Sequence, residues 1–125
     1  MNSTNDSIPG SFKGPFHPLV RDLVQAAREL ILEVMPNAIE QVDPSANLIG
    51  FGTDRTAKGL ICGIVVHKTF INRLLARGAE LPDPDRLLWG TGKNARHIRI
   101  QFVEDLYFPG VSHLLESAVD LHGSK

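Results

Sequence analysis

The fold depends on the segment Arg77-Gly78-Ala79-Glu80-Leu81-Pro82-Asp83-Pro84-Asp85-Arg86-Leu87-Leu88-Trp89-Gly90-Thr91-Gly92-Lys93-Asn94-Ala95-Arg96-His97-Ile98-Arg99, a long structured connection between two predicted strands. It holds the only tryptophan of the 125-residue chain. Its prolines and glycines are typical of turns and loops, so regular structure is expected mainly on either side of it.

Short apolar segments flank this connection and predict the strands of a sheet. They cover residues 47–53, 60–66 and 70–76 before the connection and Arg96 to Phe102 after it. The links between the first three are short, which favours antiparallel pairing. In the last strand apolar and polar side chains alternate, which predicts one face on the core and one in solvent. The apolar set is Ile98, Ile100 and Phe102, and the polar set is His97, Arg99 and Gln101.

A helix is predicted at each end of the chain. Apolar residues recur at helical spacing between Pro18 and Met35 and again from Pro109 to about Gly123. Residues 36–46 are predicted to be an irregular or helical link with Ile39 and Val42 facing inward. We therefore expect an α/β fold of the α+β type: a two-layer sandwich in which an antiparallel β-meander carries the N- and C-terminal helices on one face.

The length fits a single domain, predicted over residues 17–122. Residues 1–16 are rich in Ser, Asn, Gly and Pro and are predicted to be a flexible tail, pinned to the body by Phe12 and Phe16. The tail has neither a basic region nor an apolar region, so it does not resemble a signal peptide. A single cysteine, Cys62, excludes an intramolecular disulfide. We expect a cytoplasmic protein without a membrane segment, in which Cys62 fills the core.

The charge is unevenly distributed although the net charge is only −1. Between Asp54 and Arg99 nine basic residues stand against four acidic ones, whereas the flanks hold four basic and ten acidic residues. The small net charge gives no general attraction to nucleic acid or to a membrane, so neither is expected as a partner.

A glycine turn beside basic residues predicts an anion-binding site. Exposed N–H groups of Gly90-Thr91-Gly92, together with Lys93, Arg96 and Arg99, are suited to a small anion. The turn lacks the first glycine and the hydroxyl residue of a nucleotide-binding phosphate loop, and a strand follows it instead of a helix. Arg96 and Arg99 face opposite sides in a regular strand, so the cluster forms only if Arg96 is still in the loop. The alternative is that the glycines supply positive φ angles and the basic residues are solvated.

Acidic residues on the two predicted helices indicate a metal-binding surface. They fall on one line of each helix, and carboxylate oxygens suit hard cations, while a histidine adds some affinity for ferrous iron. The first line consists of Asp22, Glu29 and Glu33, and the second of His113, Glu116 and Asp120. The alternative is that both lines are solvated faces of amphipathic helices.

No catalytic constellation can be assigned from the sequence, so an enzyme is not the favoured class. The histidines are scattered without the spacing of a zinc site. Trp89 is predicted to be structural and to plug the edge of the core. Asp85 is predicted to cap a short helical turn through Leu87 and Leu88.

Several segments, in this order, resemble the YdhG-like domain family over about residues 18–121. They are Pro36-Asn37-Ala38-Ile39-Glu40, Gly78-Ala79-Glu80-Leu81-Pro82-Asp83-Pro84, Leu87-Leu88-Trp89-Gly90-Thr91-Gly92-Lys93 and Arg96-His97-Ile98. Most members of that family have no assigned activity, and one is described as a frataxin-like iron chaperone. The resemblance implies a compact α/β domain with an antiparallel sheet, and iron as a cargo.

Three functions follow from these observations. The first is a frataxin-like accessory protein that binds iron on its helices and delivers it to an accepting protein. The second is a module that binds a small anionic ligand at the Gly78–Arg99 connection. The third is an interaction domain whose uncovered sheet face meets a protein partner. A pocket on that face lined by Arg73, Arg99 and Gln101 would favour the second function, and a flat apolar face would favour the third.

Overall fold

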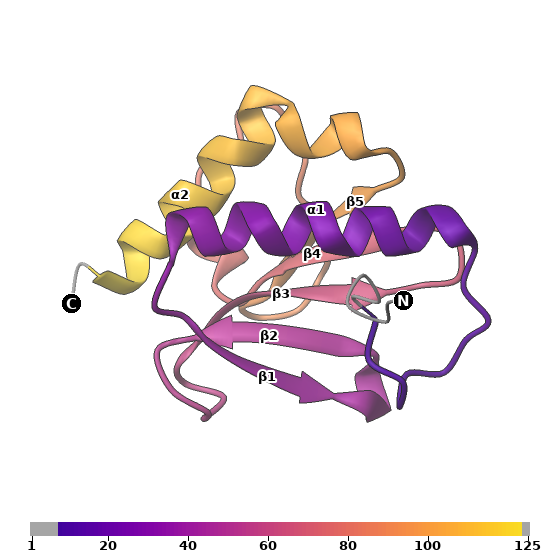
Figure 1. The fold of residues 1–125 in the computed structure, drawn as a ribbon. Coiled ribbons are helices and arrows are strands. Elements are labelled where there is room, and N and C mark those ends of the chain that lie inside the picture. The colour runs from indigo at the N-terminus through magenta and orange to yellow at the C-terminus, as the bar shows by residue number, and fades with distance from the viewer. Residues whose placement is uncertain (1–7, 124–125) are drawn as a thin grey trace.

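The structure is a computed structural model, and it describes residues 8–123. It has an α+β fold in which two helices pack on a five-stranded antiparallel sheet of strand order β1-β2-β3-β4-β5 (Figure 1). The helices are α1 (Pro18–Val34) and α2 (Pro109–Gly123), and the strands are β1 (Ile39–Asp43), β2 (Leu48–Gly52), β3 (Leu60–Val66), β4 (Ile71–Leu75) and β5 (Arg96–Ile100). Short 3-10 helices cover η2 (Pro44–Ala46), η3 (Gly78–Glu80) and η4 (Val103–Tyr107).

The predicted fold class is confirmed, with one strand more than the sequence indicated. Residues 36–46 are not a helical link, because Ile39–Asp43 pairs with β2 as an edge strand. In a strand, Ile39 and Val42 lie on opposite faces, so the prediction that both face inward is wrong. Val42 is 45% exposed.

The first helix begins and ends where the sequence predicted. The Nδ1 atom of His17 accepts a hydrogen bond from the Leu19 N–H at 3.1 Å, and Pro18 occupies the first turn, where no N–H is needed. Pro36 follows the last residues of the helix and stops it. The buried face of α1 consists of Val20, Leu23, Val24, Ala27 and Ile31.

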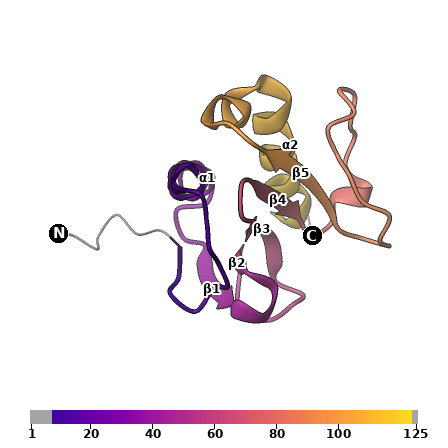
Figure 2. The ribbon, with the colours of Figure 1, turned by 90° about the vertical axis from the view of Figure 1, so that its right-hand side faces the viewer.

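Both helices lie on the same face of the sheet. Each contacts β3, and they contact each other, so the sheet has one covered face and one uncovered face (Figure 2). Side chains that are paired in register point to the same face of a sheet. On the covered face they form the core, which in β2, β3, β4 and β5 consists of Ile49, Phe51, Cys62, Ile64, Val66, Ile71, Leu75, Ile98 and Ile100.

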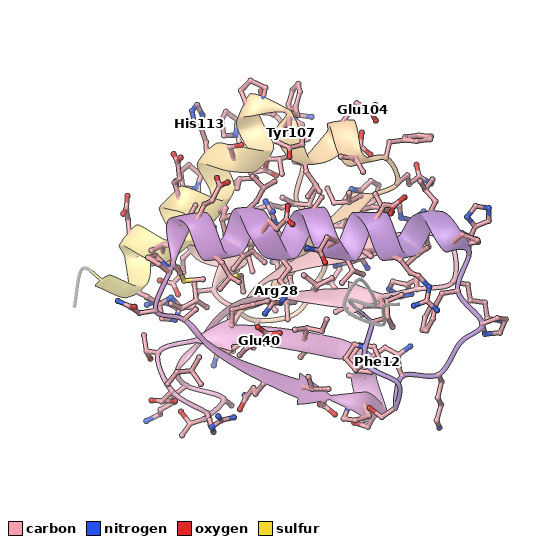
Figure 3. All side chains as sticks on the ribbon, viewed as in Figure 1. Phe12, Arg28, Glu40, Glu104, Tyr107 and His113 are labelled. Atoms are coloured by element: carbon pink, nitrogen blue, oxygen red, sulfur yellow. The ribbon has the colours of Figure 1, made fainter. Side chains whose placement is uncertain are left out.

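The N-terminal side of the domain is fastened at two places. Ile8 and Phe12 are buried in the core, so residues before Pro18 contribute to the packed domain. Of the predicted flexible tail, residues 1–16, the first seven lie outside the described residues. Arg28 of α1 and Glu40 of β1 point toward each other (Figure 3), with Arg28 Nη2 2.9 Å from Glu40 Oε1.

None of the helices in residues 8–123 is both long and apolar enough to cross a bilayer.

The connection between β4 and β5 departs from the sequence prediction. Asp83, not Asp85, binds the backbone: its two carboxylate oxygens accept the N–H groups of Leu87 and Leu88 at 2.8 and 3.0 Å. No helical turn forms there, because Arg86 has a φ of 55°.

Two aromatic side chains that were expected inside are exposed. Leu87 and Leu88 are half-buried against the core, whereas Trp89 is 65% exposed, so the prediction that it plugs the core is wrong. The strand β5 ends at Ile100, and Phe102 is 58% exposed and does not extend the apolar set of Ile98 and Ile100.

Candidate functional site

The uncovered face of the sheet carries aromatic and basic side chains at one end. In the β4–β5 pair, Asn72 lies opposite Arg99 and Leu74 lies opposite His97. Arg73 lies between them in β4 and points to the helices, where it is buried. The pocket lined by Arg73, Arg99 and Gln101, which would have favoured an anion-binding module, therefore does not form on the uncovered face.

Phe70 is the centre of this cluster. The turn between β3 and β4 brings the His67 ring onto it, with ring centroids 4.5 Å apart and planes inclined by 16°. The guanidinium carbon of Arg99 lies 4.4 Å from the Phe70 centroid, a cation–π arrangement. Phe70 therefore fixes the position of a positive charge on the uncovered face.

The surroundings of His67 favour its neutral form. Partial burial lowers the pKa of its imidazole, and the positive charge of Arg99 and the nearby His97 lower this pKa further. The Nε2 atom of His67 lies 3.3 Å from Asn72 Nδ2 and can accept from that amide when the ring proton is on Nδ1. Arg99 is the permanently charged group beside Phe70.

Trp89 reaches the same face because its backbone pairs with β5. Its N–H donates to the His97 carbonyl at 2.8 Å, and the His97 N–H donates to the Trp89 carbonyl at 2.9 Å. Directly paired residues share a face, so the indole lies with His97 and Arg99. Gly90, with a φ of 129°, allows the chain to turn away after Trp89, a conformation that side-chain-bearing residues rarely adopt.

Trp89, His97 and Arg99 line a hollow of about 190 Å³. It offers the exposed ring system of Trp89 for stacking, a guanidinium for charge pairing and an imidazole for hydrogen bonding. This combination suits a planar ring that carries a negative charge. We call Phe70, Trp89, His97 and Arg99 the aromatic–arginine cluster.

The structure separates the residues of the predicted anion site. Arg96 is the first residue of β5, and its Nη1 donates to the Gly92 and Ala95 carbonyls at 2.6 and 2.7 Å. It therefore holds the glycine turn together, and it faces the other side of β5 from Arg99. Lys93 is exposed in that turn.

The six predicted metal-binding side chains are all exposed on α1 and α2. Within residues 8–123 no three His, Cys, Asp or Glu side chains come close enough to hold an ion. Glu33 and Glu116 line one small hollow between the helices. Glu29 accepts a hydrogen bond from Gln25 at 2.6 Å.

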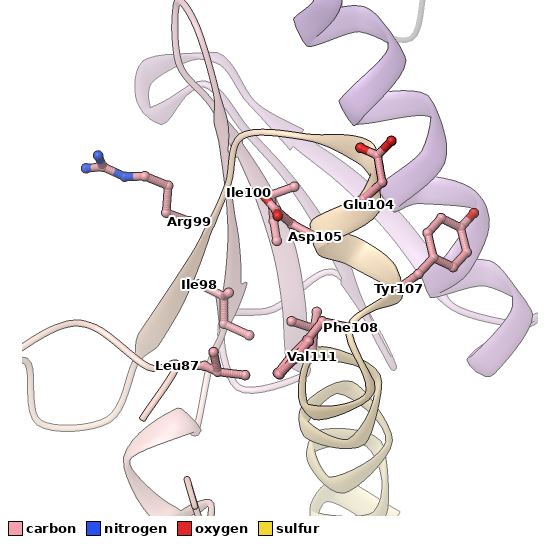
Figure 4. A pocket seen from close by; sticks show the side chains of 9 residues that line it. All are labelled: Leu87, Ile98, Arg99, Ile100, Glu104, Asp105, Tyr107, Phe108 and Val111. Atoms are coloured by element: carbon pink, nitrogen blue, oxygen red, sulfur yellow. The ribbon is translucent and has the colours of Figure 1, made fainter. Parts of the chain in front are cut away.

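The largest hollow, about 550 Å³, lies where β5, η4 and the start of α2 meet (Figure 4). Its apolar floor includes Ile98, Ile100 and Val111, and its polar rim includes Glu104 and Asp105. Asp105 is already used, because it accepts the N–H groups of residues 101 and 102, each at 3.0 Å. The Arg99 side chain points away from this hollow (Figure 4), so the floor offers apolar contact without a positive charge.

The sequence identified Arg99 as a site residue and placed His97 on its face, but it did not identify Phe70, His67 or Trp89 as part of the site. The alternation of residues 96–102 already placed His97 and Arg99 on one face. The only sequence feature that linked Phe70 to His67 was the short turn between them, which brings the two residues close together. Trp89 could not be placed, because its position depends on pairing across a seven-residue loop, for which the sequence has no periodic signal.

Comparisons of the chain with known protein families, with curated proteins and with solved structures found no match.

Proposed function

We propose that this protein binds a small anionic ligand with a planar ring on the aromatic–arginine cluster. The observation that carries this proposal is the exposed Trp89, paired through its backbone with His97 beside the Arg99 guanidinium. A nucleoside monophosphate or an aromatic carboxylate has the required combination of ring and charge.

The cluster is organised before any ligand arrives. Arg99 is oriented by stacking on Phe70, and Trp89 is held by two backbone hydrogen bonds, so less conformational entropy is lost on binding. The hollow is smaller than the roughly 300–1,000 Å³ of typical ligand pockets. Only one ring fits, and the rest of the ligand stays in solvent. We therefore expect weak affinity, on the order of a micromolar to millimolar dissociation constant.

The single tryptophan supplies the test. Adenosine monophosphate stacked on Trp89 should quench the tryptophan emission of the wild-type protein and saturate. Adenosine lacks the charge and inorganic phosphate lacks the ring, so each should bind more weakly. Arg99→Gln should weaken the nucleotide titration about tenfold or more, since a charge-assisted contact contributes roughly 1.5–3 kcal/mol.

Lys93→Ala is the matched control, because it removes a positive charge from the neighbouring turn. It should leave the titration close to wild type. If Lys93→Ala abolishes binding while Arg99→Gln does not, the anion lies at the glycine turn. An emission that does not change with any of the three compounds contradicts the proposal.

Iron delivery, which the resemblance to the YdhG-like family implies, is the second candidate. It is supported by Glu33 and Glu116, which line the same hollow between α1 and α2. It is opposed by Arg73, which lines that hollow too and repels a cation. Anaerobic calorimetry with ferrous iron tests it: binding that is lost when Asp22, Glu29 and Glu33 are replaced by Asn or Gln would support delivery, and an absence of heat would remove it.

A further inference from the structure

Arg73 is a buried charge on the covered face of the sheet. It lies in β4, paired with Ile64 of β3 on one side and with Ile98 of β5 on the other, and its exposed fraction is 1%. Among the buried residues of the described chain it is the only polar or charged one. A guanidinium in such a place requires partners, because burial of an uncompensated charge is costly.

The described residues leave part of this guanidinium without partners. The Nε and Nη2 atoms of Arg73 are buried and have no hydrogen-bond partner within residues 8–123. Cys62 lies on the same face, but burial raises the pKa of its thiol to about 12, so this group is neutral near pH 7 and cannot balance the charge.

A hollow of about 110 Å³ opens from Arg73 between α1 and α2. Four of its lining residues are apolar, and the others besides Arg73 supply a hydroxyl and two exposed carboxylates. These residues are Leu30, Glu33, Val34, Leu106, Ser112, Leu115 and Glu116. A hollow of this small size suits a small ion or a short acid.

We propose that this hollow is a binding site for a small monocarboxylate, of the size of acetate or propionate, whose oxygens pair with the Arg73 guanidinium. A carboxylate matches the fork of N–H donors of arginine, and the apolar walls accept a short alkyl group. Glu33 and Glu116 repel anions at this hollow, so a single negative charge is favoured over phosphate or sulfate. The site is separate from the aromatic–arginine cluster, because the two lie on opposite faces of the sheet.

Thermal unfolding tests the proposal with sodium acetate and with sodium fluoride at the same ionic strength. A ligand that binds only the folded state raises the melting temperature with its concentration. The wild-type melting temperature should rise in acetate beyond its change in fluoride, and in Arg73→Met the two salts should act alike. Glu33→Gln should enlarge the acetate effect, because it removes one repelling charge.

Equal responses to acetate and fluoride in the wild type would overturn the proposal and would indicate that Glu33 or Glu116 turns inward to pair with Arg73. An acetate effect that persists in Arg73→Met would overturn it as well. If Arg73→Met does not fold, an NMR titration of the wild-type protein with acetate tests the site instead. The chemical shift of the Arg73 Nε–H resonance should change and reach saturation as acetate is added, and an unchanged resonance would reject the site.

Discussion

Arg73 and Arg99 lie on neighbouring strands, yet they are in opposite situations. Arg73 points to the covered face, where its guanidinium is buried and two of its nitrogens lack a partner among the described residues. Arg99 points to the uncovered face, where it stacks on Phe70 and lines a hollow open to solvent. From this difference we expect that a charge on this sheet stabilises the fold little where water reaches it and destabilises the fold where water does not. We propose that both positions bind anions, but of different sizes.

The largest effect is expected at the buried arginine. Arg73→Met replaces a buried charge by an apolar side chain of similar length, so in a buffer without carboxylates it should stabilise the protein by about 1–4 kcal/mol. Urea denaturation measures the change. A variant that is less stable than wild type would show that Arg73 has internal partners, and the contrast between the two arginines would then fail.

The same substitution on the uncovered face should have a smaller effect of opposite sign. Arg99→Met removes the cation–π contact with Phe70 and should cost about 0.5–1 kcal/mol. A double-mutant cycle with Phe70→Leu isolates this contact. Additive effects of the two substitutions would mean that the stacking contributes nothing to stability.

The pH dependence of stability probes the charge beside Arg99. The fold lowers the pKa of His67, so the unfolded chain takes up a proton at a higher pH than the folded protein. The contribution of neutral His67 to the free energy of unfolding is fully present above the ordinary histidine pKa of about 6.5. It is lost as the pH falls through the lower pKa of His67 in the folded state. His67→Gln should flatten the stability profile in this window. A profile equally steep in wild type and variant would assign the loss to other groups.

The smallest effect is expected at Trp89. Because its side chain is exposed, Trp89→Ala should change the free energy of unfolding by less than about 0.5 kcal/mol, far below the roughly 3–5 kcal/mol of a buried tryptophan. The same variant should lose nucleotide binding, measured by calorimetry. A large loss of stability would restore Trp89 to a structural role and would weaken the proposed function.

Regular elements with strong periodicity were predictable from the sequence. The apolar stripe between Pro18 and Met35 and the branched residues of β3 are buried as expected, because each matches the period of its element. The edge strand β1 was missed, since Glu40, Gln41 and Asp43 have weak strand propensity. It is held by pairing with β2 and by the Arg28–Glu40 ion pair, contacts between segments that a local pattern does not reveal.

The candidate sites depended more on such contacts than on local pattern. Alternation in residues 70–76 groups Arg73 with Ile71 and Leu75, so the pattern alone predicts that these three side chains share a face. The structure keeps the alternation and buries the charge. Whether Arg96 and Arg99 could share one site depended on whether β5 begins before or after Arg96. The ends of strands and helices are the least certain part of a prediction from sequence.

Backbone amide NMR of the wild-type protein with adenosine monophosphate tests the central claim most directly. If the aromatic–arginine cluster binds the ligand, the resonances that shift should be those of His97, Arg99, Asn72 and Trp89, and the amides of α1 should stay in place. Shifts concentrated in residues 91–94, or at η4 and the start of α2 around the largest hollow, would contradict the assignment of the site to the uncovered face of the sheet.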